Sequence, residues 1–416
     1  MSGRPGGRKA GMATGGTINL GVIGLGRGLM LALPALIAHP AIRLVAAADP
    51  RPVARERFAA EFGARAYADW AELLADPAID AVYIAAPHQF HAEQAVAAAR
   101  AGKHVLVEKP MALSLDDCRA MAGAAQQAGT VLVTGPSHSF DAPVRHAAAL
   151  IASGAVGAPR LITALNYTDF LFRPRRPEEL DPAQGGGVVL SQAAHQIDIA
   201  RLLAGSPLRS VRAVTGDWDA ARPSEGAYAA LLDFANGCAA TLTYSGYARF
   251  DSDALQGGTG EFGQPKDPAA HATARRRIAA LSPAEEAAAK LARAYGGASP
   301  ALPPAPVANE QFGLVLISCE RADLRLMPDG VWTYADDGAR FTPLPPPPAA
   351  QYGAIAAFAE ACRGGPLPPQ AGGWGIDTVK ACLALSQSAH ERREIRIEPE
   401  DPLHEQTAAY PGLLEL

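Results

Sequence analysis

From Ile18 onward, the first third of the chain alternates short apolar runs with longer stretches whose apolar residues recur at helical spacing. We expect strands at 18–23, 43–48, 81–86, 104–108 and 130–134, with helices near 28–38, 51–62, 88–101 and 114–128. Apolar strands separated by helices of this length are typical of a parallel sheet that is covered on both faces. The pattern predicts an α/β domain with a doubly wound parallel sheet, of Rossmann type, over residues 17–138.

Beyond residue 138 the pattern changes to longer stretches in which apolar and polar residues alternate. Such alternation is typical of strands with one face on a core, and we expect them at 160–170, 210–219, 227–247 and 322–335. Asn236-Gly237 and Asp329-Gly330 stand where hairpin turns are needed. Helices are expected at 188–204 and 375–391. Residues 139–400 are therefore predicted to form a second, α+β domain with an open, mainly antiparallel sheet.

Three segments depart from both patterns. Residues 251–309 combine a glycine-rich stretch, a charged helical piece and a proline-rich connector. We expect them to be an insertion that acts as a lid or an oligomer contact. Residues 1–16, rich in glycine and polar residues, are expected to be a disordered tail, and residues 401–416 a second tail. Either Met1 or Met12 could be the start of translation.

Composition narrows the class of protein. The 416 residues are 49% hydrophobic and 19% charged, with a formal net charge of −5, which argues against nucleic acid or an anionic membrane as the main partner. The five cysteines are scattered without a CxxC pair, and no apolar run is long enough to span a bilayer. We therefore expect a cytoplasmic protein. The histidines have no metal-ligand spacing such as HxxxH, so no metal is expected.

The first strand runs into the turn GVIGLGRGLM, in which Gly24 and Gly26 precede a helix. Glycines at this position let a pyrophosphate approach the backbone at a helix N-terminus. The third glycine of the dinucleotide fingerprint should stand at 29, where the chain has Leu29, and Gly28 comes one place early. On this motif alone, a nucleotide site and a plain glycine turn remain open.

The second strand ends at Asp49, where an acid should meet the adenosine ribose hydroxyls of a dinucleotide. Asp49 could also cap the next helix, and the two roles are compatible. An acid at this position repels a 2′-phosphate, which favours NAD over NADP. Arg51 tempers the preference because it could accept that phosphate.

Two further strands end in polar residues at the same edge of the sheet. The run AVYIAA is followed by Pro87, His88 and His91. The run HVLV is followed by Glu108, Lys109 and a proline. We expect the histidines near the nicotinamide, although a helix cap or a surface position would also explain them. Lys109 could bind a substrate hydroxyl or exchange its proton, or it could form a structural pair with Glu108.

Together, GVIGLGRG, AAADP, AAPHQFH, GKHVLVEKPMA and GGGVVLSQAAHQID resemble the Gfo/Idh/MocA oxidoreductases. The resemblance implies an NAD(P)-dependent dehydrogenase, acting on a CH–OH or CH–CH donor, with a Rossmann domain and an open-sheet domain. It places Lys109 beside the nicotinamide and the reacting carbinol, and it implies that the Lys109–Pro110 bond is cis. It also makes His195 the acid/base. It also implies association through the open sheet, as a homodimer or homotetramer. The expected cofactor site is Gly24, Gly26, Arg27, Gly28, Asp49, Pro87, His88, His91 and Glu108.

The segment around His195 begins with three glycines, residues 185–187, ahead of a predicted helix. Ser191, His195 and Asp198 stand at i, i+4 and i+7, which places them on one face of an α-helix. We expect Ser191 and Asp198 to contact the substrate beside the acid/base. The family usually has an acid where this chain has Ser191, so any charged relay is altered.

Arg173, Arg175 and Arg176 form a basic cluster before the glycines. Arginine forks match carboxylates, so we expect these residues to bind a carboxylated substrate, although they could instead pair with Glu178 and Glu179. NYTDFLFRPRRPEELDPAQGGG, SHSFDAP and LTYSGYARFDSD resemble the branch of phthalate cis-4,5-dihydrodiol dehydrogenases. The sequence therefore predicts NAD-dependent oxidation of a carboxylated cis-dihydrodiol to a catechol. The alternatives are a sugar or inositol dehydrogenase of the same family and a non-catalytic dinucleotide-binding regulator.

Overall fold

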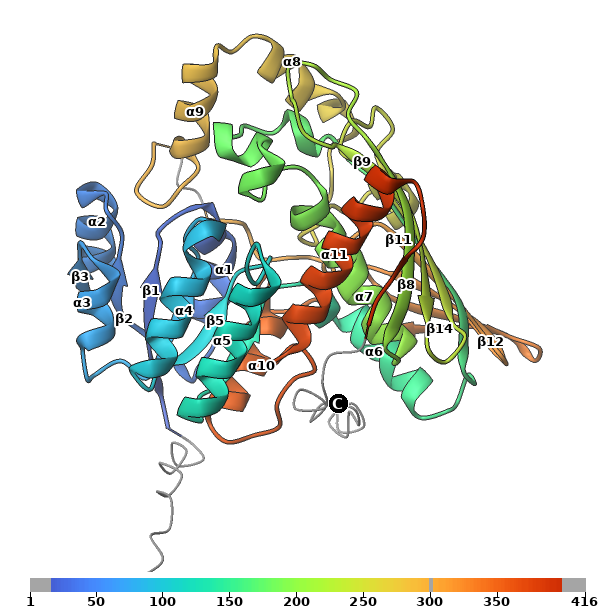
Figure 1. The fold of residues 1–416 in the computed structure, drawn as a ribbon, viewed down its shortest axis with the longest axis horizontal. Coiled ribbons are helices and arrows are strands. Elements are labelled where there is room, and N and C mark those ends of the chain that lie inside the picture. The colour runs from blue at the N-terminus through green and yellow to red at the C-terminus, as the bar shows by residue number, and fades with distance from the viewer. Residues whose placement is uncertain (1–15, 299–301, 399–416) are drawn as a thin grey trace, which may run out of the picture.

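The apolar runs of the first domain pair in one six-stranded parallel sheet, in the order β3-β2-β1-β4-β5-β6 (Figure 1). The structure is a computed structural model that describes residues 16–298 and 302–398. The strands are β1 (Ile18–Ile23), β2 (Ile42–Ala48), β3 (Arg65–Tyr67), β4 (Ala81–Ile84), β5 (His104–Val107) and β6 (Leu132–Thr134). The strand order reverses beside β1, and the carboxyl ends there border the crevice in which such sheets hold ligands.

Helices cover both faces of this sheet because its strands are apolar on both sides. Val82 and Tyr83 of β4 point to opposite faces and enter different cores. The helices on the Tyr83 side are α1 (Arg27–Ala38), α2 (Pro52–Phe62) and α10 (Tyr352–Cys362). Those on the Val82 side are α3 (Trp70–Ala75), α4 (His91–Arg100), α5 (Leu115–Ala128) and α11 (Trp374–Glu391). The last helices of the chain thus return to the first sheet.

The second sheet has nine strands, in the order β14-β13-β12-β11-β7-β10-β9-β8-β15. In chain order they are β7 (Pro159–Tyr167), β8 (Leu208–Gly216), β9 (Ala227–Phe234), β10 (Ala239–Ser245), β11 (Leu314–Cys319), β12 (Ala322–Met327), β13 (Gly330–Ala335), β14 (Gly338–Pro343) and β15 (Ile395–Arg396). Every neighbouring pair is antiparallel except β7 and β10. The prediction of an open, mainly antiparallel sheet is confirmed.

One face of the second sheet is covered by α11 and by α6 (Ala142–Ala152) and α7 (Ala194–Ala204). The opposite face carries exposed apolar side chains: Leu231 of β9 is 49% exposed and Leu316 of β11 is 38% exposed. The stretch predicted at 227–247 is the β9–β10 hairpin, whose turn contains Asn236-Gly237, with Gly237 at φ 81°.

The insertion at 251–309 contains two helices, α8 (Thr273–Ala279) and α9 (Pro283–Ala292). α9 begins with a capping box between Ser282 and Glu285 and has Pro283 at its first position, so its start is encoded locally. Figure 1 shows α9 descending from the second domain toward α2. The predicted tails lie outside the described residues, apart from Gly16. Within residues 16–298 and 302–398, none of the helices combines the length and apolarity that a membrane span requires.

Candidate active site

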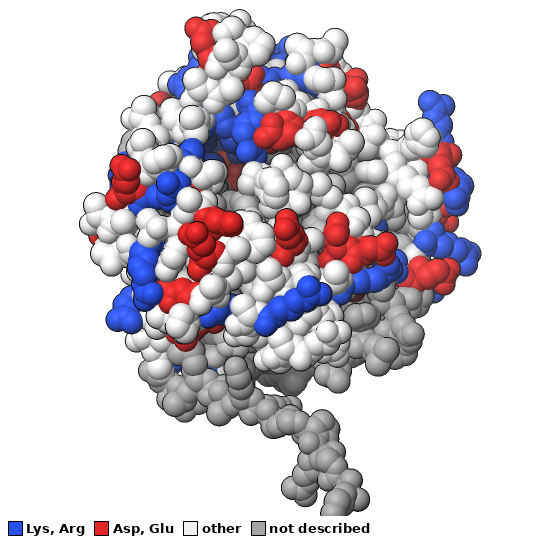
Figure 2. Space-filling model, turned by 60° about the vertical axis from the view of Figure 1, so that its left-hand side comes forward, with Lys and Arg blue, Asp and Glu red and all other residues white. Residues whose placement is uncertain are grey.

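A cavity of about 840 Å³ lies between the two domains. Its walls are the carboxyl ends of strands in the first sheet, the loop and helix around residues 170–195, and residues of the insertion. Figure 2 shows basic side chains gathered in a recess on the face where the first domain comes forward. The glycine turn of the first domain, Lys109 and His195 all line this cavity.

The glycine turn shapes the part of the cavity next to α1. Gly24 has φ 92°, and a Cβ there would lie 2.7 Å from the backbone nitrogen of Ala86, so only glycine fits. Gly26 is the N-cap of α1 and supplies no side-chain cap, which leaves the first N–H groups of the helix free for an anion. Leu29, which replaces the third glycine of the fingerprint, is fully buried in the core. The turn therefore fits the pyrophosphate of a dinucleotide.

Asp49 lines the cavity at the end of β2 and holds this turn in place. Its Oδ2 accepts the Leu25 N–H at 2.7 Å, and its Oδ1 accepts the Arg51 Nε–H at 2.9 Å. Arg51 also donates from Nη2 to the Leu25 carbonyl at 2.7 Å and from Nη1 to the Tyr295 carbonyl at 3.4 Å. All three guanidinium nitrogens are engaged, so a 2′-phosphate would compete with these contacts for Arg51, which favours NAD.

The loop after β4 divides its histidines between the cavity and the interior. Pro87 and His88 line the cavity, and burial lowers the pKa of His88 to about 3, so its ring is neutral. His91 is fully buried and lies outside the cavity. Its ring nitrogens lie 3.0 Å from the Pro110 carbonyl and 3.0 Å from the Ala86 carbonyl. Contrary to the expectation that His91 contacts the cofactor, the structure does not bring it to the cavity, because its ring nitrogens face the carbonyls of two loops.

Lys109 lines the cavity after β5 and reaches the second domain. The Lys109–Pro110 bond is cis, as the resemblance implied. Lys109 Nζ donates to the Ser191 carbonyl at 2.8 Å, and burial lowers the pKa of the ammonium. Glu108 accepts the Tyr83 hydroxyl at 2.6 Å, and burial raises the pKa of its carboxyl. Lys109 thus links the two domains, and burial makes its ammonium a stronger acid than that of an exposed lysine.

The segment before α7 starts as one π-helical turn, Val189–Ala193, and not as an α-helix. The Ser191 hydroxyl donates to the Gly187 carbonyl, and both Ser191 and His195 line the cavity. Because a π-turn takes more residues than an α-turn, the i, i+4, i+7 spacing does not describe one continuous α-helical face. Ser191 and His195 are brought together, and Asp198 is not.

Asp198 is a buried residue that points away from the cavity. Its Oδ2 accepts the hydroxyls of Ser137 at 2.6 Å and Ser139 at 2.5 Å, and its Oδ1 accepts the indole N–H of Trp374. Contrary to the expectation that Asp198 binds substrate, the structure does not bring it to the cavity, because donors from two segments, the loop after β6 and α11, occupy its carboxylate. Its contacts join α7 to α11 and to the loop after β6.

His195 is 6% exposed, and its Nδ1 is buried without a hydrogen-bond partner in the described chain. Its ring lies 4.8 Å from the rings of both His138 and Phe312, measured between centroids. Burial, then the charge of Lys109, then that of His138 lower the pKa of His195 well below its ordinary value of 6.5. His195 is therefore neutral at physiological pH and can accept a proton.

His138 is a site residue for which the sequence analysis predicts no role, although SHSFDAP contains it. Its Nδ1 lies 2.7 Å from Asp141 Oδ2 and its Nε2 lies 3.6 Å from Glu261 Oε1. Burial opposes the charge of the ring, but Asp141 and then Glu261 outweigh it and raise the pKa of His138 to about 10. His138 is a fixed cation beside His195. Glu261 comes from the insertion, where no motif pointed to it.

Other cavity residues were also beyond sequence reasoning. They come from the loop after β6, the π-turn, the insertion and the segment before β11. The cavity residues missed from sequence include His138, Asp141, Gln192, Glu261, Lys290, Arg293 and Glu310.

The basic cluster lines the cavity, and two of its three arginines already have acidic partners. Arg173 Nη1 lies 3.5 Å from Glu261 Oε2, and Arg173 Nε lies 3.5 Å from Asp169 Oδ1. Arg176 Nε lies 3.3 Å from Glu178 Oε1. The pairing expected with Glu178 and Glu179 is therefore present for Arg176. Arg173 pairs instead with the insertion.

Arg175 is different. Its Nη2 donates to the Phe170 carbonyl at 2.8 Å, and its guanidinium lies 3.6 Å from the centre of the Phe170 ring. Its Nε is buried and has no hydrogen-bond partner, and no carboxylate of residues 16–298 or 302–398 forms an ion pair with it. Burial lowers the pKa of Arg175 to about 10. This arginine is available to an anion in the cavity.

A parallel sheet with a glycine turn, joined to an open sheet across a cavity that holds a lysine and a neutral histidine, defines an NAD-binding oxidoreductase. Residues 18–135 match the family described as "Oxidoreductase family, NAD-binding Rossmann fold", and residues 144–259 match the Gfo/Idh/MocA C-terminal domain. The chain belongs to the Gfo/Idh/MocA family and is a dehydrogenase.

Three relatives place the chain within the family. It is 42% identical over 372 residues to 1-carboxy-3-chloro-3,4-dihydroxycyclohexa-1,5-diene dehydrogenase of Comamonas testosteroni, covering 88% of this chain and 94% of that protein. It is 32% identical over 196 residues to scyllo-inositol 2-dehydrogenase (NAD(+)) of Bacillus subtilis, covering 47% and 56%. A crystal structure from Bordetella bronchiseptica RB50 has a TM-score of 0.87 and 40% identity, covering 92% of this chain and all of that one.

Proposed function

We propose that the protein oxidises a secondary alcohol of a carboxylated cyclic cis-dihydrodiol, with NAD as cofactor, to give a catechol. The observation that carries the substrate class is Arg175, a cavity arginine whose guanidinium has no acidic partner. The Comamonas testosteroni relative, whose name gives a carboxylated cyclohexadiene diol, supports the same class.

Within the basic cluster, the number of unpaired arginines favours one substrate carboxylate over two. Arg173 and Arg176 are paired with Glu261 and Glu178, whereas Arg175 is not paired. A second substrate carboxylate at this end would have to displace Glu261 or Glu178 from its arginine. These two pairs are partly exposed, so each costs little to break, but its displacement would leave a carboxylate beside the incoming anion. We therefore favour a monocarboxylated dihydrodiol over the phthalate dihydrodiol, which carries two carboxylates.

The roles of the cavity residues follow from their charge states. NAD, when bound, takes the hydride that leaves the carbinol carbon. The neutral His195 accepts the proton of the hydroxyl group, because its lowered pKa keeps the ring unprotonated. Lys109 stabilises the negative charge that develops on the same oxygen. The first product, a hydroxycyclohexadienone, tautomerises to an aromatic catechol, which drives the oxidation forward.

Within the cofactor site, we propose roles for the residues that line the cavity. They are Gly24, Gly26, Arg27, Gly28, Asp49, Pro87, His88 and Glu108. For the substrate we propose Arg175 and Ser191, with Arg173 and Arg176 setting the charge around them.

Assays of NADH formation on a panel of substrates test this proposal. The panel contains a monocarboxylated cis-dihydrodiol, phthalate cis-4,5-dihydrodiol, uncarboxylated benzene cis-dihydrodiol, and myo- and scyllo-inositol. We expect the monocarboxylated dihydrodiol to have the highest kcat/KM. Highest activity on an inositol would favour the sugar or inositol alternative, for which the Bacillus subtilis relative is a precedent. NAD binding without turnover of any substrate would favour a regulator.

Replacing Arg175 by glutamine should raise KM for the carboxylated dihydrodiol by about tenfold to a hundredfold, because a charge-assisted hydrogen bond is lost. KM for the uncarboxylated dihydrodiol should stay the same. Arg249→Gln, at an exposed arginine of the same domain, is the matched control. An equal loss on both substrates would show that Arg175 does not read the carboxylate.

We also propose that the protein forms a homodimer or homotetramer through the bare face of its second sheet. One row of paired positions crosses four neighbouring strands of this sheet and contains Leu231, Thr241, Thr163 and Leu316. Leu161, on the same sheet, is 44% exposed. Exposed leucines on one sheet face, here Leu161, Leu231 and Leu316, are typical of an interface. Leu231→Glu should lower the mass measured by light scattering to that of a smaller assembly, whereas Leu367→Glu, at an exposed loop residue, should not.

A cytoplasmic location is proposed on the five free cysteines, four of them buried, and on the NAD cofactor. Fractionation of the source cells tests it.

A further inference from the structure

The insertion bridges the two domains over the cofactor end of the cavity. At the second domain, Glu286 of α9 forms an ion pair with Arg222 at 2.9 Å, and Lys290 pairs with Glu179 at 2.7 Å. Figure 1 shows α9 standing above the ends of β1 and β2. The start of the bridge is therefore fixed to the second domain by two partly buried ion pairs.

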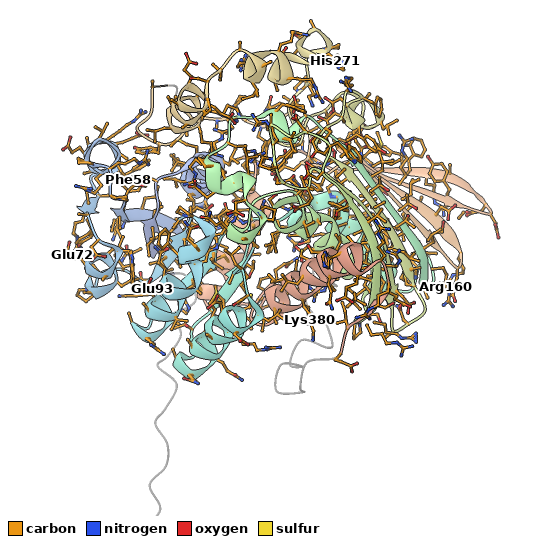
Figure 3. All side chains as sticks on the ribbon, turned by 45° about the horizontal axis from the view of Figure 1, so that its top comes forward. Phe58, Glu72, Glu93, Arg160, His271 and Lys380 are labelled. Carbon is orange, nitrogen blue, oxygen red and sulfur yellow. The ribbon has the colours of Figure 1, made fainter. Side chains whose placement is uncertain are left out.

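Its other end is fixed to α2 of the first domain. The Tyr295 side chain is 1% exposed, and its hydroxyl donates to Glu61 Oε2 at 2.7 Å. Its ring meets the Phe58 ring edge-on at 5.7 Å between centroids, and Arg57 lies over its other side at 5.2 Å. Figure 3 labels Phe58 on α2, on the side of the molecule where the insertion arrives. A Cβ on Gly296 would lie 2.9 Å from Ala54 Cα, so the chain passes α2 in close contact.

Arg293 lies between these two anchors and lines the cavity. It is half-buried, and within the described ranges its guanidinium has neither a hydrogen bond nor an ion pair. Arg27, the first residue of α1, lines the same cavity and is equally unpaired in the part of the chain that the structure describes. Two arginines without partners thus face the cavity where the helix N-terminus also offers free N–H groups.

The two guanidinium groups are close enough to repel one another. Burial, then the charge of Arg293, then that of Arg173 lower the pKa of Arg27 to about 10. Glu261, whose charge reaches Arg27, is already engaged by His138 and Arg173. Like charges held together in a protein are stabilised by an anion between them. The diphosphate of NAD carries two negative charges and belongs at this helix N-terminus.

We propose that Arg293 of the insertion binds the diphosphate of NAD together with Arg27, from the side opposite the glycine turn, so that the insertion acts as a clamp on the cofactor. This role requires the cofactor and is independent of the substrate proposed above. It assigns to residues 251–309 a function in nucleotide retention, because the same segment that carries Arg293 is fastened to both domains.

Calorimetric titration of the full chain tests the clamp without turnover. We expect Arg293→Gln to weaken binding of both NAD and ADP-ribose by about tenfold to a hundredfold, since both contain the diphosphate. Adenosine, which lacks it, should bind as it does to the unchanged protein. Arg293→Lys should lose less affinity than Arg293→Gln because it keeps the charge. Arg276→Gln, at an exposed arginine of α8 in the same insertion, should bind all three ligands normally.

Several results would overturn the proposal. Unchanged NAD affinity in Arg293→Gln would exclude contact with the diphosphate. An equal loss for adenosine would place Arg293 on the nucleoside, and a larger loss for NADP than for NAD would place it on the 2′-phosphate. The melting temperature without ligand distinguishes cofactor binding from a structural role of Arg293. Because the substitution removes the repulsion with Arg27, Arg293→Gln should melt at the same temperature as the unchanged protein or higher. A marked decrease would contradict the clamp. Stopped-flow release of NADH should be faster in Arg293→Gln, and an unchanged rate would also count against it.

Discussion

Lys109→Ala is expected to lower kcat/KM for dihydrodiol oxidation by about a thousandfold, while NAD affinity changes only a few-fold. Proton transfer and electrostatic stabilisation by one positioned group each contribute factors of roughly 10² to 10⁴. Lys109 Nζ lies in the cavity, 2.8 Å from the Ser191 carbonyl, so its removal leaves the developing oxyanion without its cation. NADH formation measures the rate, and calorimetry measures NAD binding.

Lys109→Arg separates the two ways in which the lysine can act. Arginine keeps the positive charge but does not release its proton near neutral pH. If Lys109 only stabilises charge, this variant should recover part of the activity that alanine loses. If Lys109 exchanges the proton itself, arginine should be as inactive as alanine. Turnover by Lys109→Ala within a few-fold of the unchanged enzyme would contradict any role of Lys109 in the reaction.

His195→Asn is expected to lower kcat/KM by a factor of about 10² to 10⁴ and to change the pH profile. The pKa of His195 lies well below 6.5 because of burial, Lys109 and His138, so the base is unprotonated at neutral pH. The oxidation rate should therefore be independent of pH near neutrality and fall on the acidic side as the pH decreases through the lowered pKa of His195. At high pH the rate should fall again as Lys109, whose pKa burial lowers, loses its proton.

The acidic limb of this profile identifies the base. It should disappear in His195→Asn, and an unchanged limb in that variant would assign it to another group. His138→Gln provides an independent check, because it removes a cation whose ring lies 4.8 Å from that of His195. The pKa of His195 should then rise, and the acidic limb should move to higher pH. A limb that stays in place would show that the charge of His138 does not act on His195.

Most of the first domain could be predicted from its sequence because its strands are continuous apolar runs. β1 and β5 start as expected, and the helices near 28–38 and 114–128 are α1 and α5. β3, α3 and the edge strand β14 were not predicted, since they are short or exposed and show weak periodicity. α6 and α10 were also missed, although α10 is alanine-rich and helps to cover the first sheet.

The site residues also differ in whether the local sequence was enough to predict their positions. Asp49, His88 and Lys109 lie within four residues of the carboxyl ends of β2, β4 and β5, and a parallel sheet gathers these strand ends at one edge. Asp198 was placed on the substrate face because the sequence does not show that its helix begins with a π-turn. His91 stands in the same loop as His88, and only packing decided that its ring turns inward, between the carbonyls of Pro110 and Ala86.

The two kinds of sheet, the glycine turn, the Glu-Lys-Pro end of β5 and the basic cluster could be predicted from sequence, because each depends on residues close together in the chain. The pairing of the charges could not, because it depends on contacts between distant segments. Arg173 meets Glu261 across 88 positions of sequence, and this contact leaves Arg175 as an arginine of the cluster without an acid. Ion pairing depends on distances of a few ångströms between segments that the fold brings together, and local periodicity carries no information about such distances.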